Sequence, residues 1–222
     1  YPLVVYFGEN GGGDQISVSY TAPSATETSD GTGVYFSSRQ SITTLDVDTA
    51  NATDSNSDAN IKTSTIQAAL GSSNISLNAT RDIKVQSPIS LSDSSNTLTL
   101  DSGNTIVIDQ SITGVGSLNL HSDTGVAVNA NLNAESINVR ATVSGGLSGS
   151  GNISVDGSGL EVIQVGDTTY SGEISGNGGL NKERLGTLTL SGANTYSGST
   201  SIDSGTLLVS GSLSDSTVVD VS

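Results

Sequence analysis

The sequence predicts an all-β chain that is wound for most of its length into a right-handed parallel β-helix. Three observations predict this solenoid. Short apolar-polar-apolar triplets recur from Ile75 onward, they repeat at the interval of a solenoid coil, and aromatic residues are concentrated in the first 36 positions. With 27 glycines, 4% aromatic residues and neither Met nor Trp, the chain can fill only a thin core. The recurring strands of Ile, Leu and Val distinguish it from a disordered chain.

The triplets share a common register. Each one, read as a strand, points its first and third side chains to the same face. Ile75, Ile83 and Ile89 are separated by 8 and 6 residues, and the sets that begin at Leu98 and Leu118 repeat these intervals. The three sets begin 23 and then 20 residues apart, which is the size of a coil with three short strands and three bends. A sandwich of short antiparallel strands is the alternative that the triplets alone leave open.

Stacking one coil on the next, about 4.8 Å away, pairs every strand and closes the apolar column. Small aliphatic side chains fit this narrow column, and we expect aromatic side chains to be excluded from it. After Ile137 the next triplet arrives 16 residues later, through the glycine-rich stretch SGGLSGSGN, which predicts a shortened or bent coil. The inward column is expected to contain Ile75, Leu77, Ile83, Val85, Leu98, Leu100, Ile106, Ile108, Leu118, Leu120, Val126 and Val128.

The opening of the chain has a different composition, with six of its eight aromatic residues in the first 36 positions. The segment YPLVVYF, the glycine turn ENGGGD and the segment QISVSYTAP predict a β-hairpin. This stretch, followed by DGTGVYF, resembles the last strands of the β-sandwich of protective-antigen and flocculin-type proteins. Lectin-like members of that family bind sugar through a calcium-holding pair of aspartates upstream of these strands. No residue here matches that pair, so the resemblance does not imply that this chain binds sugar.

Residues 38–60 are expected to form a linker, because the run DVDTANATDSNSDAN is polar and has no apolar period. Three oxygen-bearing residues stand at alternate positions in it, as the first ligands of a calcium loop do: Asp54, Asn56 and Asp58. Ala59 replaces the glycine of such a loop and Thr65 replaces its bidentate glutamate, which makes these residues a weak calcium candidate. The sequence predicts no other cofactor.

The end of the chain carries a more specific motif. It resembles the passenger-associated repeat of bacterial autotransporter adhesins in Tyr170, Ser171 and Gly172, in Gly179, Leu180 and Lys182, in GTLTLSGANTYSG from Gly186, and in Gly205, Thr206 and Leu207. The resemblance implies a parallel β-helix exported to the cell surface, in which the repeat assists secretion and folding. Residues 183–185 depart from the small residues usual in the repeat, so the resemblance does not imply the shape of the turn that they form. The stretch STIQAALGSSNISLNATRDIKV also resembles filamentous-haemagglutinin-type coils.

These observations divide the chain into four parts. Residues 1–37 are expected to be the C-terminal strands of a β-sandwich, and residues 38–60 the linker. Residues 61–169 are expected to form β-helix coils, which residues 170–222 continue with the passenger-associated repeat.

Charge and residue usage exclude several functions. The net charge of −15 argues against nucleic acid as a partner, and a chain without cysteine has neither disulfides nor thiolate metal sites. The only histidine, His121, lies three residues after Leu118, where the two earlier coils have Asn78 and Asp101, so we expect it at a polar bend. No two acids share an offset in adjacent members of the three aligned coils. The sequence therefore predicts no catalytic residue.

The leading hypothesis is a non-catalytic stalk or fibre segment of a secreted bacterial surface adhesin. A β-helical glycan-active enzyme or tailspike fragment, and a carbohydrate-binding module, are the alternatives. Both ends of the chain fall within structural units and carry no polar cap, so we expect contact with more of the same polypeptide or with identical copies head to tail. A host or cell-surface glycan is a further candidate partner. No stretch has the length of apolar sequence that crosses a bilayer.

Overall fold

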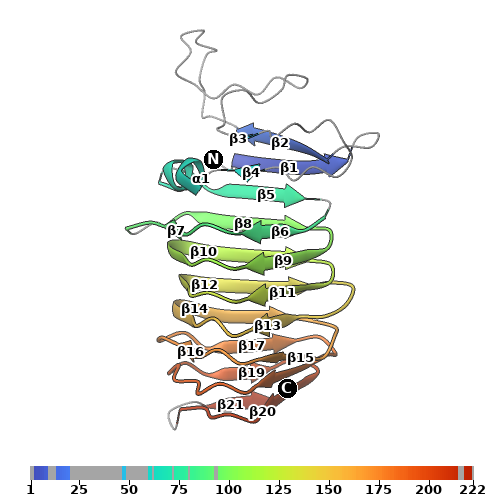
Figure 1. Cartoon of the computed structure of the whole chain (residues 1–222). Coiled ribbons are helices and arrows are strands. Elements are labelled where there is room, and N and C mark those ends of the chain that lie inside the picture. The colour runs from blue at the N-terminus through green and yellow to red at the C-terminus, as the bar shows by residue number, and fades with distance from the viewer. Residues whose placement is uncertain are drawn as a thin grey trace.

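The protein is a parallel β-solenoid of about seven turns, with one short helix (Figure 1). The computed structural model describes the backbone of residues 3–9, 14–20, 47–48, 60–61, 63–71, 73–79, 81–92, 95–214 and 218–221, and the side chains from residue 63 onward. Within these residues the strands lie in two long sheets and one two-stranded ladder.

The first sheet contains twelve strands. Ten follow one another in the order β2 (Asp14–Tyr20), β1 (Leu3–Glu9), β5 (Ile75–Ala79), β8 (Thr97–Ser102), β10 (Ile112–Ser122), β12 (Leu132–Ala141), β14 (Ile153–Ile163), β17 (Leu180–Glu183), β19 (Thr200–Ile202) and β21 (Val219–Val221). Two short strands lie off this path, β7 (Ile89–Ser90) beside β10 and β16 (Ile174–Ser175) beside β14.

The second sheet contains seven strands, in the order β20 (Thr206–Val209), β18 (Thr187–Leu190), β15 (Thr168–Tyr170), β13 (Leu147–Gly149), β11 (Gly125–Val128), β9 (Thr105–Ile108) and β6 (Ile83–Val85). The remaining elements are the ladder of β3 (Val47–Asp48) with β4 (Asn60–Ile61) and the helix α1 (Thr63–Leu70). No helix in the described part of the chain has the length and apolar character needed to span a membrane.

The register of the coils confirms the predicted solenoid. Leu98 pairs with Leu118 on parallel strands, and Ile106 pairs with Val126 in the second sheet. All pairs between successive coils are parallel, so the antiparallel sandwich is wrong for this part of the chain. The residues that open successive coils in the first sheet are Ile75, Leu98, Leu118, Ile137, Leu160, Leu180, Thr200 and Val219.

The coil after Ile137 is not shortened. Ile137 pairs with Leu160, which makes this coil as long as the one that separates Ile75 from Leu98. β14 bulges where Ala134 and Ser136 of β12 face Val155 and Gly159, so two extra residues of β14 are absorbed there. The predicted shortening is therefore wrong, and the irregularity lies in β14, after the glycine-rich stretch on which the prediction rested.

The predicted inward column forms the core. Every predicted member is buried except Ile83, which is partly buried and packs against the others. The expected exclusion of aromatic residues is wrong, because Tyr170 and Tyr196 are both fully buried. Their hydroxyl groups have partners inside the solenoid, the carbonyl oxygen of Gly151 for Tyr170 and the Thr200 hydroxyl, 2.6 Å away, for Tyr196. A buried tyrosine with a satisfied hydroxyl stabilises a core as other large side chains do.

The N-terminal hairpin joins the solenoid. β1 and β2 pair antiparallel, which confirms the predicted hairpin, and β1 pairs in parallel with β5 from Leu3 opposite Ile75 onward. The sequence did not reveal α1, whose Ile66 and Leu70 lie one helical turn apart and are buried against the core. β1 thereby occupies the edge of β5, the first strand of the first coil (Figure 1).

One corner of the later coils is built from stacked glycines, because the backbones approach too closely there for a side chain. The column consists of Gly151, Gly172, Gly192 and Gly211. A Cβ atom on each of the last three would lie 1.8, 2.3 and 2.1 Å from the carbonyl oxygen of the glycine one coil before. These distances are far below van der Waals contact, and the obstructing atoms belong to the backbone.

Replacing Gly172 by alanine should destabilise the solenoid by at least about 1–3 kcal/mol, since the new methyl group must push two coils apart. Gly71→Ala is the matched control, because its nearest atom, the carbonyl oxygen of Ala68, lies 3.4 Å from the new Cβ. Thermal unfolding followed by circular dichroism compares the two. Equal melting temperatures for both variants would contradict the close approach at this corner.

Candidate functional site

The outer face of the first sheet carries two columns of side chains, aligned by the pairing of successive strands. The His121 column contains Asn78, Asp101, His121, Arg140, Ile163 and Glu183. The neighbouring Asn138 column contains Ser76, Thr99, Asn119, Asn138, Glu161, Asn181 and Ser201. Because side chains alternate along a strand, these residues point away from the core that their neighbours fill.

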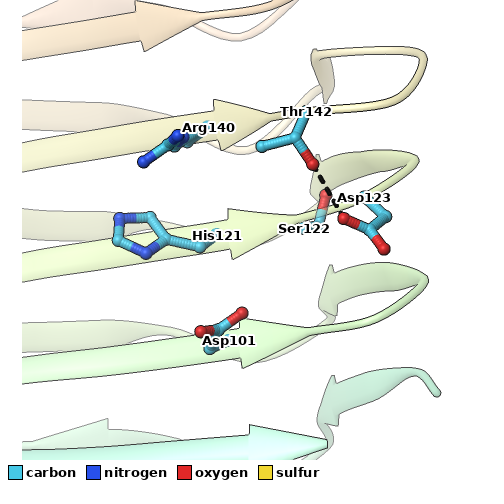
Figure 2. A pocket seen from close by; sticks show the side chains of 6 residues that line it. All are labelled: Asp101, His121, Ser122, Asp123, Arg140 and Thr142. Atoms are coloured by element: carbon cyan, nitrogen blue, oxygen red, sulfur yellow. Dashed lines mark hydrogen bonds between the residues drawn. The ribbon is translucent and has the colours of Figure 1, made fainter. Parts of the chain in front are cut away.

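A pocket of about 190 Å³ lies where the His121 column meets the corner that follows the strands. Figure 2 shows Asp101, His121 and Arg140 on three successive strands, with the corner residues beside them. The corner residues form the second wall of the pocket. The hydroxyl of Thr142 donates a hydrogen bond of 2.7 Å to Asp123 Oδ1 and holds this wall in place. The pocket is lined by Asp101, His121, Ser122, Asp123, Arg140 and Thr142, each of which carries a polar or charged group.

The electrostatics of the pocket favour a neutral imidazole at pH 7. Burial lowers the pKa of His121 below its ordinary value of 6.5, and the nearby charge of Arg140 lowers it further. The carboxylate of Asp101 and the nearby side chain of Asn138 act in the opposite direction and are outweighed. A neutral imidazole offers one hydrogen-bond donor and one acceptor.

The sequence placed His121 in the correct register but in the wrong kind of element. It is aligned with Asp101, which is aligned with Asn78, as predicted. His121 nevertheless lies within β10 and not at a bend, and it is only partly exposed. Arg140 was missed because it lies beyond the three coils whose intervals repeat in the sequence.

The structure also brings together two acids that the sequence did not pair. Glu161 of β14 and Glu183 of β17 lie on adjacent strands, offset by two residues. Asn138 Nδ2 donates to Glu161, and Asn181 Nδ2 donates to Glu183 Oε1 at 3.2 Å. Burial raises the pKa of Glu161 above its ordinary value of 4.5, and the nearby Glu183 raises it further.

The environment of these two acids has a structural explanation. The charge of Glu183 makes ionisation of Glu161 less favourable, and hydrogen bonds from Asn138 and Asn181 hold the two side chains in place.

A buried lysine forms hydrogen bonds with backbone carbonyl groups at a corner inside the solenoid. Lys182 is fully buried, and its Nζ donates to the carbonyl oxygens of Glu183 and Arg184 at 2.8 and 2.9 Å. Burial lowers its pKa, against the charges of Asp167 and Glu183. Arg184 has a φ of 66° and Leu185 is 85% exposed, so the departure from the small-residue motif gives a turn whose side chains project outward.

The calcium candidates Asp54, Asn56 and Asp58 lie outside the described residues, and calcium binding by them stays a prediction. In the part of the chain that the structure does describe, no group of three or more His, Asp or Glu residues is arranged to hold a metal ion.

The fold and its polar outer face define a β-solenoid with a repeated coil, and one comparison with known families extends this description. Residues 185–209 match the model of the passenger-associated-transport-repeat. The matched segment contains β18, β19 and β20 and lies within the part whose motif resembled this repeat. Repeats of this family are associated with secreted autotransporter passengers. No curated protein and no solved structure matches the chain.

Replacing Glu161 by glutamine should stabilise the protein at pH 7 and leave it unchanged at pH 4. The pKa of Glu161 is raised in the folded state, so its favourable contribution is complete below 4.5 and is lost as the pH rises through the folded value. Glutamine keeps the hydrogen bonds without the charge. We expect a gain of a few degrees in melting temperature, because a partly exposed charge is screened by solvent.

The exposed Glu135 provides the matched control, and Glu135→Gln should shift neither melting temperature. If Glu161→Gln lowers the melting temperature at pH 7, the carboxylate is stabilising and the interpretation that its charge is unfavourable in the folded protein is wrong.

Proposed function

We propose that this chain is a non-catalytic stalk or fibre segment of a secreted bacterial surface adhesin. The observation that carries the proposal is the uninterrupted parallel pairing from β5 to β21, because each coil contacts only its neighbours and the stack extends along one axis. A stack of coils of this kind forms a long and stiff segment. The match of residues 185–209 to a passenger repeat supports export to the cell surface.

The domain division proposed for the whole protein follows the same view. Residues 1–37 are the last strands of a protective-antigen or flocculin-type β-sandwich, residues 38–60 a linker, and residues 61–169 and 170–222 successive parts of the stalk. The parallel pairing of β1 with β5 supports a direct connection between the hairpin and the first coil.

The partners we propose are further coils, from the same polypeptide or from identical copies in head-to-tail contact. Val219 and Val221 continue inward positions of the first sheet, yet they are 51% and 69% exposed. In earlier coils the aligned positions are buried, as at Leu160 and Val162. Another coil stacked on this end would cover both valines and pair the edges of β20 and β21.

Deleting one coil tests the stalk. Removal of residues 160–179 joins the chain at aligned positions, because Leu160 pairs with Leu180. It also removes Glu161 and so separates the acid pair. In the full-length surface protein, we expect this variant to be exported and to bind its target cells about as well as the parent. Intact-cell antibody labelling and a cell-binding assay measure the two properties.

Removal of residues 160–169 is the control, because a half coil destroys the register and should abolish folding and surface display. Purified full-coil variant and parent are also incubated with a panel of polysaccharides. Cleavage by the parent that the full-coil deletion abolishes would overturn the non-catalytic proposal, and loss of display by the full-coil variant would overturn the modular stalk.

A further inference from the structure

The pocket of the His121 column contains a positively charged side chain that is available to bind a ligand. Arg140 is exposed, and among the described residues its guanidinium has neither an ion pair nor a hydrogen bond. Asp101 lies two strands away, at a backbone separation of about 9.6 Å, with His121 between them. The two charges therefore flank the opening without neutralising each other, as Figure 2 shows.

The groups around the opening specify the chemistry of a ligand. Arg140 supplies a planar fork of donors that matches a carboxylate. Asp101 and Asp123 only accept hydrogen bonds, so they require hydroxyl or amine donors from the ligand. The imidazole of His121 can bind a hydroxyl group as donor or acceptor. Every residue that lines the pocket carries a polar or charged group, so a ligand with several hydrogen-bonding groups suits it best.

Charge and size narrow the class further. With a neutral imidazole, Asp101, Asp123 and Arg140 give the pocket a net charge of −1, which repels a dianion such as phosphate more than a monoanion. A volume of about 190 Å³ is below the range of about 300–1,000 Å³ that holds a drug-sized ligand, so the pocket has room for one small ring. A single sugar ring with one carboxylate and several hydroxyl groups meets all of these conditions.

We propose that this pocket binds an acidic sugar unit of the hexuronate type, with its carboxylate on Arg140 and its hydroxyl groups on Asp101 and His121. The site is built from three successive coils, and it needs no other part of the chain. It would bind sugar whether or not the solenoid serves as a stalk, so a failure of one proposal leaves the other standing.

The single histidine makes the test direct. His121 is the only histidine in the chain, so its ring protons give isolated signals in a proton NMR spectrum. Glucuronate and galacturonate are titrated at pH 7.5 into the 222-residue protein, with glucose as the neutral control and acetate as the simple anion. We expect a saturable shift of the His121 signals with a uronate, and no saturable shift with glucose or acetate.

Arg140→Gln should weaken uronate binding at least about tenfold, as expected for loss of a charged hydrogen-bond pair. Lys84→Gln is the matched control, since it removes one exposed positive charge from β6 in the second sheet and should leave the affinity unchanged. Circular dichroism checks that both variants fold. N-acetylneuraminate, titrated in parallel, distinguishes a sialylated glycan from a uronate polysaccharide as the source of the sugar.

Saturable binding of any of these acidic sugars that depends on Arg140 supports the site. Equal shifts with acetate and uronates, an affinity unaffected by Arg140→Gln, or the absence of any saturable shift would overturn it.

Discussion

Parallel backbone pairing between coils, at about 4.8 Å, is the constraint on which the rest of this structure depends. It converts the sequence into columns, because a residue in one coil lies directly against its counterpart in the next. Inward columns are apolar through most of their length, as from Leu77 through Leu100 and Leu120 to Val139. Lys182 is the exception in this column, and its ammonium group is hydrogen-bonded to two carbonyl oxygens.

The corners are where this spacing is hardest to maintain, because the chain must turn without separating adjacent coils. Two solutions occur. Stacked glycines such as Gly151 and Gly172 let the backbones touch. Elsewhere a buried polar side chain satisfies backbone groups that the turn leaves unpaired, as Gln164 does by donating to the carbonyl oxygens of Gly166 and Thr187 at 2.9 and 3.0 Å. Without such partners, buried backbone groups would cost free energy that so thin a core cannot offset.

The sequence predicted the solenoid because its intervals repeat without interruption through three coils. The prediction failed where a bulge changes the interval between strands or where a hydrogen bond allows a large side chain into the core. The bulge of β14 displaces Leu160 from its expected interval, and the core can hold Tyr170 because its hydroxyl reaches a carbonyl oxygen one coil away. The residues of the candidate site divide in a similar way. Asp101 and His121 fall in the aligned coils and could be placed together from sequence. Arg140 lies in the next coil, where the repeated intervals have already ended, and the Glu161–Glu183 pair lies beyond the bulge.

The same constraint separates the requirements of a stalk from those of a binding surface. Backbone pairing and the inward columns hold the coils together, and neither depends on the identity of the outward side chains. Asp101, His121 and Arg140 can therefore stand next to one another on three coils without any contribution to the core. Their mutual spacing is nevertheless fixed by the strands beneath them, which provides the rigidity that a small polar ligand requires for orientation. A solenoid can thus acquire a binding site on its outer face while its length and stability remain those of the coil stack.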